Sequence, residues 1–213
     1  MKQGDIRLSG PCALDGGDRF IHAARRLVEA FPSVNWEAGG ALDGQLLIRL
    51  REIENLPEGA FSISLRKEQS RPVIEITGGP FSGVIYGVEE LISRADGDTI
   101  ALGDAPVTAS PGLSYRTFWT WDHSTNWELN QIGQQEIGVF NPYGKPPSGF
   151  LADYCRVVDF CSQNRIAAVV IYGFLRDSHG GIAAAQELCH YANERGVLIL
   201  PGIAIGSYGG VYW

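Results

Sequence analysis

The sequence predicts two parts of different fold class, an α+β domain followed by a β-α-β-α-β unit with parallel strands. In the first half, apolar and polar residues alternate along strand-like runs, which is typical of a sheet with one face in water. In the second half the runs are continuously apolar, AAVVI and VLILPGIAI, as in parallel strands that are covered on both faces. A stretch with prolines and a glycine, residues 104–112, separates these patterns. We therefore expect an accessory domain at residues 1–110 and a second domain at 111–213.

The first half contains two helix patterns and four strand patterns. Asp18 stands where an N-cap is expected, apolar residues recur at helical spacing over residues 20–31, and Pro32 ends the pattern. A second helix is expected over residues 82–94. The strand-like runs cover residues 6–8, 45–50, 61–65 and 73–77. Because the run 61–65 alternates regularly, we expect a small, mostly antiparallel sheet with the helices packed on it.

The second half alternates strands and helices in the order of a barrel. The expected strands cover residues 115–121, 167–171 and 197–205, and the expected helices cover 150–163 and 182–195. The irregular segment 122–149 is long, and long loops in compact domains are more often functional than idle. A (β/α)₈ TIM barrel takes about 250 residues, whereas about 100 follow the boundary. We expect an incomplete barrel, with the open edge covered by the rest of the barrel or by a homo-oligomer partner; the alternative is a small open sheet.

Composition narrows the possible partners. The formal net charge is -7 and the sequence pI is about 5.1, without a lysine and arginine cluster, so nucleic acid is not an expected partner. The chain has no run of 18 apolar residues, and MKQGDIRLSG lacks the apolar core of a signal peptide. A soluble, cytoplasmic protein is therefore expected, without membrane contact. The four cysteines show no CxxC spacing and are interpreted as reduced thiols.

The segment FWTWDHSTNW, residues 118–127, holds three of the five tryptophans beside an Asp-His pair. Indole faces suit the apolar face of a sugar ring, and carboxylates and guanidinium groups suit its hydroxyls. Asp122 and Asp177 each follow an expected strand, so both are expected at the carboxyl face where barrel enzymes bind ligands. The predicted substrate-binding residues are Arg116, Trp121, Asp122, His123, Trp127, Arg176, Asp177 and His179.

Structural roles remain open for the same residues. One or more of the indoles is expected in the core, Asp177 can instead cap the following helix, and Asp122 can pair with an arginine. A metal site formed by Asp122, His123, Asp177 and His179 is chemically possible, but no HxH or HExxH spacing supports it. The glycines do not form G-x-G-x-x-G either. We therefore expect neither a metal nor a cofactor.

Three stretches resemble a known group of enzymes. IEITGGPFSGVIYGVEELI, YRTFWTWDH and ADYCRVVDFCSQNRI resemble the N-terminal half of glycoside hydrolases of the α-glucuronidase and β-N-acetylhexosaminidase type. In the α-glucuronidases the barrel opening resembles Arg116 followed by Trp121 and Asp122, whereas His123 replaces an asparagine of that family. The resemblance implies an accessory domain before a catalytic (β/α)₈ barrel.

The resemblance also implies a substrate and a limit on activity. The parent enzyme is expected to cleave glycosidic bonds of oligo- or polysaccharides, with catalytic carboxylates on later barrel strands that these 213 residues do not include. The chain alone is therefore expected to be inactive, and the catalytic residues themselves stay unknown. The alternative is a non-catalytic carbohydrate-binding or interaction protein that is complete as it stands.

Overall fold

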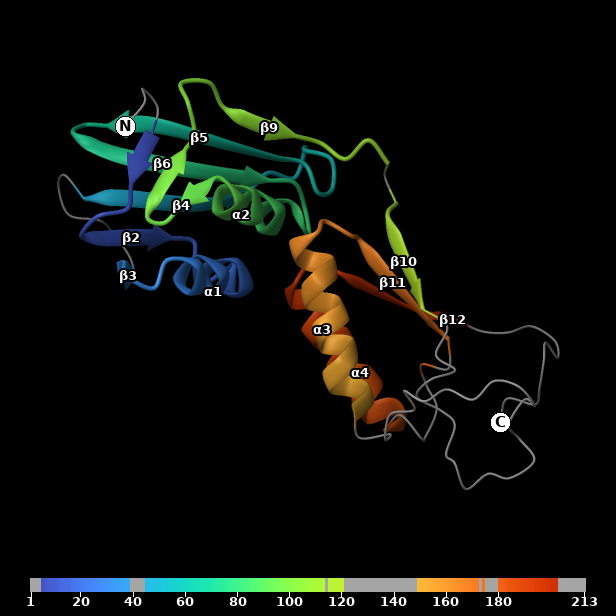
Figure 1. Ribbon diagram of the computed structural model, residues 1–213. Coiled ribbons are helices and arrows are strands. Elements are labelled where there is room, and N and C mark those ends of the chain that lie inside the picture. Colours follow the sequence, from blue (N-terminus) through green and yellow to red (C-terminus); the bar gives the residue numbers. More distant parts are fainter. Residues whose placement is uncertain are drawn as a thin grey trace, which may run out of the picture. The chain divides into compact units, whose positions relative to one another are not determined.

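A computed structural model describes residues 5–38, 45–113, 115–120, 149–172, 174 and 180–202 (Figure 1). The chain divides into two compact units, Met1–Ser114 and Tyr115–Trp213. The division falls four residues after the expected boundary at residue 110, because the last strand of the first unit lies inside the stretch interpreted as a linker. Within the described ranges, no helix has the length and apolar character needed to cross a membrane.

The first unit is built on a six-stranded sheet with the strand order β3-β2-β4-β6-β5-β9. Its strands are β2 (Pro11–Asp15), β3 (Asn35–Ala38), β4 (Leu46–Glu52), β5 (Phe61–Glu68), β6 (Arg71–Gly78) and β9 (Val107–Ala109). β3, β2, β4 and β6 are parallel neighbours, and β5 runs antiparallel to β6 and β9. The prediction of a mostly antiparallel sheet is therefore wrong, and the sheet is mixed. A separate antiparallel sheet consists of β1 (Asp5–Arg7), β8 (Thr99–Ala101) and β7 (Ala95–Asp96).

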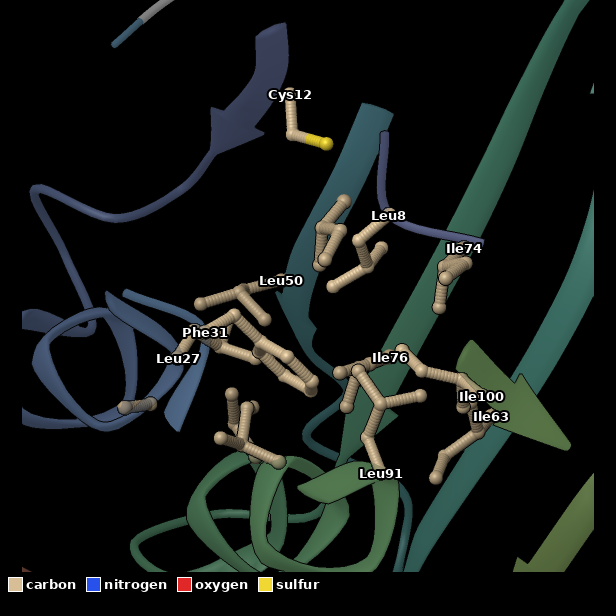
Figure 2. Packing of buried hydrophobic residues seen from close by; sticks show 14 of the residues in the cluster. Leu8, Cys12, Leu27, Phe31, Leu50, Ile63, Ile74, Ile76, Leu91 and Ile100 are labelled. Carbon is tan, nitrogen blue, oxygen red and sulfur yellow. The ribbon is translucent and has the colours of Figure 1, made fainter. Parts of the chain in front are cut away.

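Two helices, α1 (Ile21–Ala30) and α2 (Gly83–Ser93), pack with one face of the large sheet to form the core (Figure 2). Leu27 of α1 and Leu91 of α2 are fully buried together with Leu50 and Ile76 of the sheet. Alternate residues of a strand share one face, and Leu50 and Ile76 lie on the face that the helices cover. The expected cap of α1 is wrong. Phe20 is the N-cap residue and makes no side-chain cap hydrogen bond.

The opposite face of this sheet carries paired charges. The Arg49 guanidinium donates to Asp15 Oδ2 at 3.1 Å and to both carboxylate oxygens of Glu68 at 2.6 and 3.1 Å. The hydrogen bond from Arg49 lowers the pKa of Glu68 to about 2 and raises the pKa of Arg49 itself. These pairs join β2, β4 and β5 across the polar face.

The second unit contains a parallel three-stranded sheet in the order β10-β11-β12. Its elements are β10 (Thr117–Thr120), α3 (Phe150–Gln163), β11 (Ala168–Tyr172), α4 (Gly181–Glu194) and β12 (Leu198–Gly202). Both helices lie on one face of the sheet (Figure 1), where Val158 and Leu188 are fully buried with Val169 and Ile171. The β-α-β-α-β order of the sequence prediction is confirmed; closure into a barrel is not part of the described fold.

A charged cluster holds the two helices of the second unit together. Arg195, only 5% exposed, donates from Nε to Asp159 Oδ1 at 2.8 Å and stacks on the Tyr191 ring at 3.3 Å. The Tyr191 hydroxyl donates to Asp159 at 2.9 Å, and burial together with this hydrogen bond raises the pKa of Tyr191 to about 12. The cluster joins α3 to the end of α4 and so sets the start of β12.

Candidate functional site

The carboxyl edge of the β10-β11-β12 sheet is the candidate site. Thr120 at the end of β10 is in register with Ile171, and Tyr172 at the end of β11 is in register with Gly202. The three strands therefore end at one edge, which is where parallel sheets with helical crossovers bind ligands. Seven of the eight predicted binding residues follow β10 or β11 in sequence and lie outside the described residues. These are Trp121, Asp122, His123, Trp127, Arg176, Asp177 and His179.

A pair of hydroxyl groups holds the last residue of β10. Thr120 Oγ1 lies 2.9 Å from the Tyr154 hydroxyl on α3, and it donates to Val170 O on β11 at 3.0 Å. Tyr154 is only 6% exposed and its ring lies 4.7 Å from the Phe150 ring. Neither hydroxyl is among the residues predicted from the sequence to form the site. The sequence does indicate that the Tyr154 hydroxyl has a partner, because a tyrosine in the apolar stripe of a helix is buried and its hydroxyl then needs a hydrogen bond.

Alternation along β10 separates its aromatic residues. Phe118 and Thr120 are in register with Val169 and Ile171, whose side chains pack under the helices. Trp119 is in register with Val170 and belongs to the other face. The Trp119 side chain is 55% exposed, so this indole is not a core residue within the described unit.

Arg116 lies at the amino edge of the sheet, opposite to the edge where β10 and β11 end. It precedes β10, donates from Nε to Arg165 O at 2.7 Å, and accepts at its carbonyl from Ala167 N at 2.8 Å. The four residues of β10 separate it from the carboxyl edge by about 13 Å. The contacts indicate that Arg116 anchors the start of β10 to the turn before β11, and they do not bring it together with the carboxyl edge.

The glycine motif GGPFSG serves close packing in the first unit. A Cβ at Gly78 would lie 2.0 Å from Val84 N, and one at Gly79 would lie 2.0 Å from Pro57 O. A Cβ at Gly83 would lie 2.5 Å from Ala60 O. These positions accept no side chain because the end of β6, the start of α2 and the 57–60 segment meet backbone to backbone. The motif that carries part of the family resemblance is thus explained by packing.

The cysteines of the described residues are free thiols without activation. Burial raises the pKa of the Cys161 thiol to about 11, and burial is also the main cause of the raised pKa of Cys12 and Cys189. Thiols with a raised pKa are poor nucleophiles at neutral pH. Among the described residues no group of three or more histidine, cysteine, aspartate and glutamate side chains is placed to hold a metal ion.

Comparison with solved structures relates this fold to carbohydrate-active enzymes. No family model matches the sequence, and no curated protein matches it. A β-N-acetylhexosaminidase from Bacteroides fragilis superposes with a TM-score of 0.59 at 16% identity, over 94% of this chain. The GH20 exo-β-N-acetylglucosaminidase from Vibrio harveyi superposes with a TM-score of 0.60 at 12% identity, over 93% of this chain. The chain resembles glycoside hydrolases in its fold.

A further glycoside hydrolase gives the same result. A GH138 enzyme that targets the pectin rhamnogalacturonan II superposes with a TM-score of 0.56 at 18% identity, over 91% of this chain. The chain spans 41% of the Bacteroides protein, 33% of the Vibrio protein and 24% of the GH138 enzyme. It therefore corresponds in length to less than half of each of them.

Proposed function

We propose that residues 1–213 are the N-terminal part of a glycoside hydrolase that acts on oligo- or polysaccharides. In this proposal the first unit is an accessory domain and the second is the first three strands of a (β/α)₈ barrel. The observation that carries the proposal is the parallel β10-β11-β12 sheet, with both crossover helices on one face, in a chain that superposes on glycoside hydrolases over more than 90% of its length.

The proposed sugar site lies where β10 and β11 end. Trp121 and Trp127 would offer faces to the sugar ring, and Asp122 and Asp177 would accept hydrogen bonds from its hydroxyls. The two loops are neighbours in this proposal because Thr120 and Ile171 are in register at the ends of their strands. His123, Arg176 and His179 complete the proposed site; Arg116 is left out, since it lies at the other edge.

The catalytic carboxyl groups are proposed to lie outside these 213 residues. Glycoside hydrolysis generally needs two carboxyl groups on either side of the scissile bond. In the enzymes that the sequence resembles, these groups come from later barrel strands. The chain alone is accordingly expected to bind sugar without cleaving it.

Sugar binding by the full 213-residue chain tests the proposal. Methyl glycosides of N-acetylglucosamine and glucuronic acid are titrated into ¹⁵N-labelled chain, and one of them is expected to shift the amides of residues 121–123. Asp122→Asn should weaken binding by about tenfold or more, because a hydrogen bond to a charged group is lost. Asp104→Asn, the same change at an exposed residue of the first unit, is the matched control and should leave the affinity unchanged.

Two results would contradict the proposal. Absence of binding for both probes would remove the sugar site. Release of p-nitrophenol from the N-acetylglucosaminide or glucuronide at about 1 s⁻¹ or faster, an ordinary enzymatic rate, would show that the chain carries its own catalytic groups.

A further inference from the structure

We infer that the Tyr154 hydroxyl is a positioning group for the start of the sugar site, acting through Thr120. This inference rests on the proposed function for its biological meaning, whereas its structural part stands on described contacts alone. Tyr154 lies on α3 and Thr120 is the last residue of β10, so their contact joins the helix to the end of the strand that leads directly into Trp121 and Asp122.

The direction of each hydrogen bond follows from the available protons. Val170 O is a carbonyl and can only accept, so the single hydroxyl proton of Thr120 is donated to it at 3.0 Å. Thr120 Oγ1 is then left as an acceptor, and the Tyr154 O–H donates to it at 2.9 Å. The chain of donors therefore runs from the helix to the end of β10 and on to the neighbouring strand β11.

Packing alone does not explain a tyrosine at this position. The side chain is buried beside Phe150 and Val158 in an apolar cluster, where phenylalanine would fill the same space. A buried hydroxyl costs free energy unless it is hydrogen-bonded, and a hydrogen bond is directional whereas apolar contact is not. The hydroxyl therefore fixes the position of Thr120 relative to α3, which apolar contact alone would not do.

The end of β10 is where such a tie has an effect. β10 is four residues long and, among the described strands, it is hydrogen-bonded to β11. The ends of short strands open readily when few bonds hold them. Successive Cα atoms are 3.8 Å apart, so Trp121, Asp122 and His123 begin within about 11 Å of the anchored Cα. The position of Thr120 therefore limits where the following three residues can begin.

Tyr154→Phe and Thr120→Val test the inference, with Tyr191→Phe as the matched control. The control also removes one tyrosine hydroxyl from the α3–α4 pair, but its partner is Asp159. Amide hydrogen exchange is measured by NMR in the full chain. Exchange at residues 120–122 is compared with exchange at Val169 in the same variant. Relative to this reference it should be about 2- to 13-fold faster in Tyr154→Phe, which is the range for one lost hydrogen bond, and unchanged in Tyr191→Phe. Thr120→Ser, which keeps the hydroxyl, should retain the native rate.

Three outcomes would overturn the inference. These are equal exchange at residues 120–122 in the two tyrosine variants, unprotected exchange there in the native chain, and a uniform increase across the unit. Titration with methyl N-acetylglucosaminide and methyl glucuronide separates this inference from the proposed function. If the native chain binds one of them, Tyr154→Phe should weaken that binding and Tyr191→Phe should not. If it binds neither while the exchange result holds, the positioning role stands and the proposed sugar site fails.

Discussion

Replacement of Gly78 by alanine should unfold or strongly destabilise the first unit. A Cβ at this position would lie 2.0 Å from Val84 N and 2.2 Å from Gly83 C, whereas ordinary contact begins at 3.4 Å. Both obstructing atoms belong to the backbone, so no side chain can turn away to make room. The start of α2 must therefore move from β6 by roughly 1.4 Å.

The cost follows from what α2 buries. Val84, Val88 and Leu91 are at most 3% exposed, and full burial of such side chains is worth about 1.5 to 3 kcal/mol each. A gap of about 1 Å forfeits roughly a quarter to a half of the dispersion contacts at an interface. For three side chains the expected loss is about 1 to 4.5 kcal/mol, a sizeable part of the total stability of a typical domain.

Gly112→Ala is the matched control, since nothing lies within 4 Å of its Cβ position and its φ is not positive. Hydrogen exchange of peptides covering β4 and β6 reports on the first unit alone and should show loss of protection in Gly78→Ala. The control should lie within about 0.5 kcal/mol of the native protein. Equal protection in the two variants would refute the close-packing explanation and reopen a ligand-binding role for GGPFSG.

Three further outcomes are expected. The hydrogen bond from Arg49 lowers the pKa of Glu68 to about 2, so the stabilisation from this carboxylate is present above about pH 4.5 and is lost as the pH falls toward 2. The urea midpoint of the native protein should therefore fall across this pH range more steeply than the midpoint of Glu68→Gln. Asp159→Asn should destabilise the second unit by about 1.5 kcal/mol, measured by urea denaturation, because it removes the charged partner of the buried Arg195. The loss is expected at the low end for a charged hydrogen bond, since solvent screens the partly exposed carboxylate. Iodoacetamide should label Cys189, which is exposed, well before buried Cys161, and comparable rates would contradict the described packing.

The sequence predicted the second unit more accurately than the first. α3 begins and ends at the predicted residues, 150 and 163, because a long apolar stripe at helical spacing is a strong signal. In the first unit β2 and β3 were missed, since five and four residues are too few to establish a pattern. Their absence hid the parallel half of the sheet. Alternation identifies a strand with one wet face but does not reveal the direction of its neighbour, which depends on the path of the chain.

For the candidate site, the sequence predicts the edge of the sheet at which it lies but not the contacts made there. Residues that follow parallel strands reach the carboxyl edge, and that rule placed Asp122 and Asp177 in one neighbourhood. The family resemblance grouped Arg116 with them, although Arg116 precedes β10 and anchors the other edge of the sheet. The position of Tyr154 in an apolar helix stripe indicates that its hydroxyl needs a partner, but Thr120 is 34 positions away, so no local pattern identifies it as that partner.

Among the described residues, helices cover only one face of the β10-β11-β12 sheet, which favours the proposed barrel over a small open sheet. Parallel sheets normally bury both faces, and here α3 and α4 cover the face of Val169 and Ile171. The other face presents Trp119, which is 55% exposed, beside Val170 and Leu200, which are partly buried. A small open sheet with one face in water would gain by placing polar side chains on that face. Apolar side chains are instead what a barrel interior requires, since further strands would enclose them.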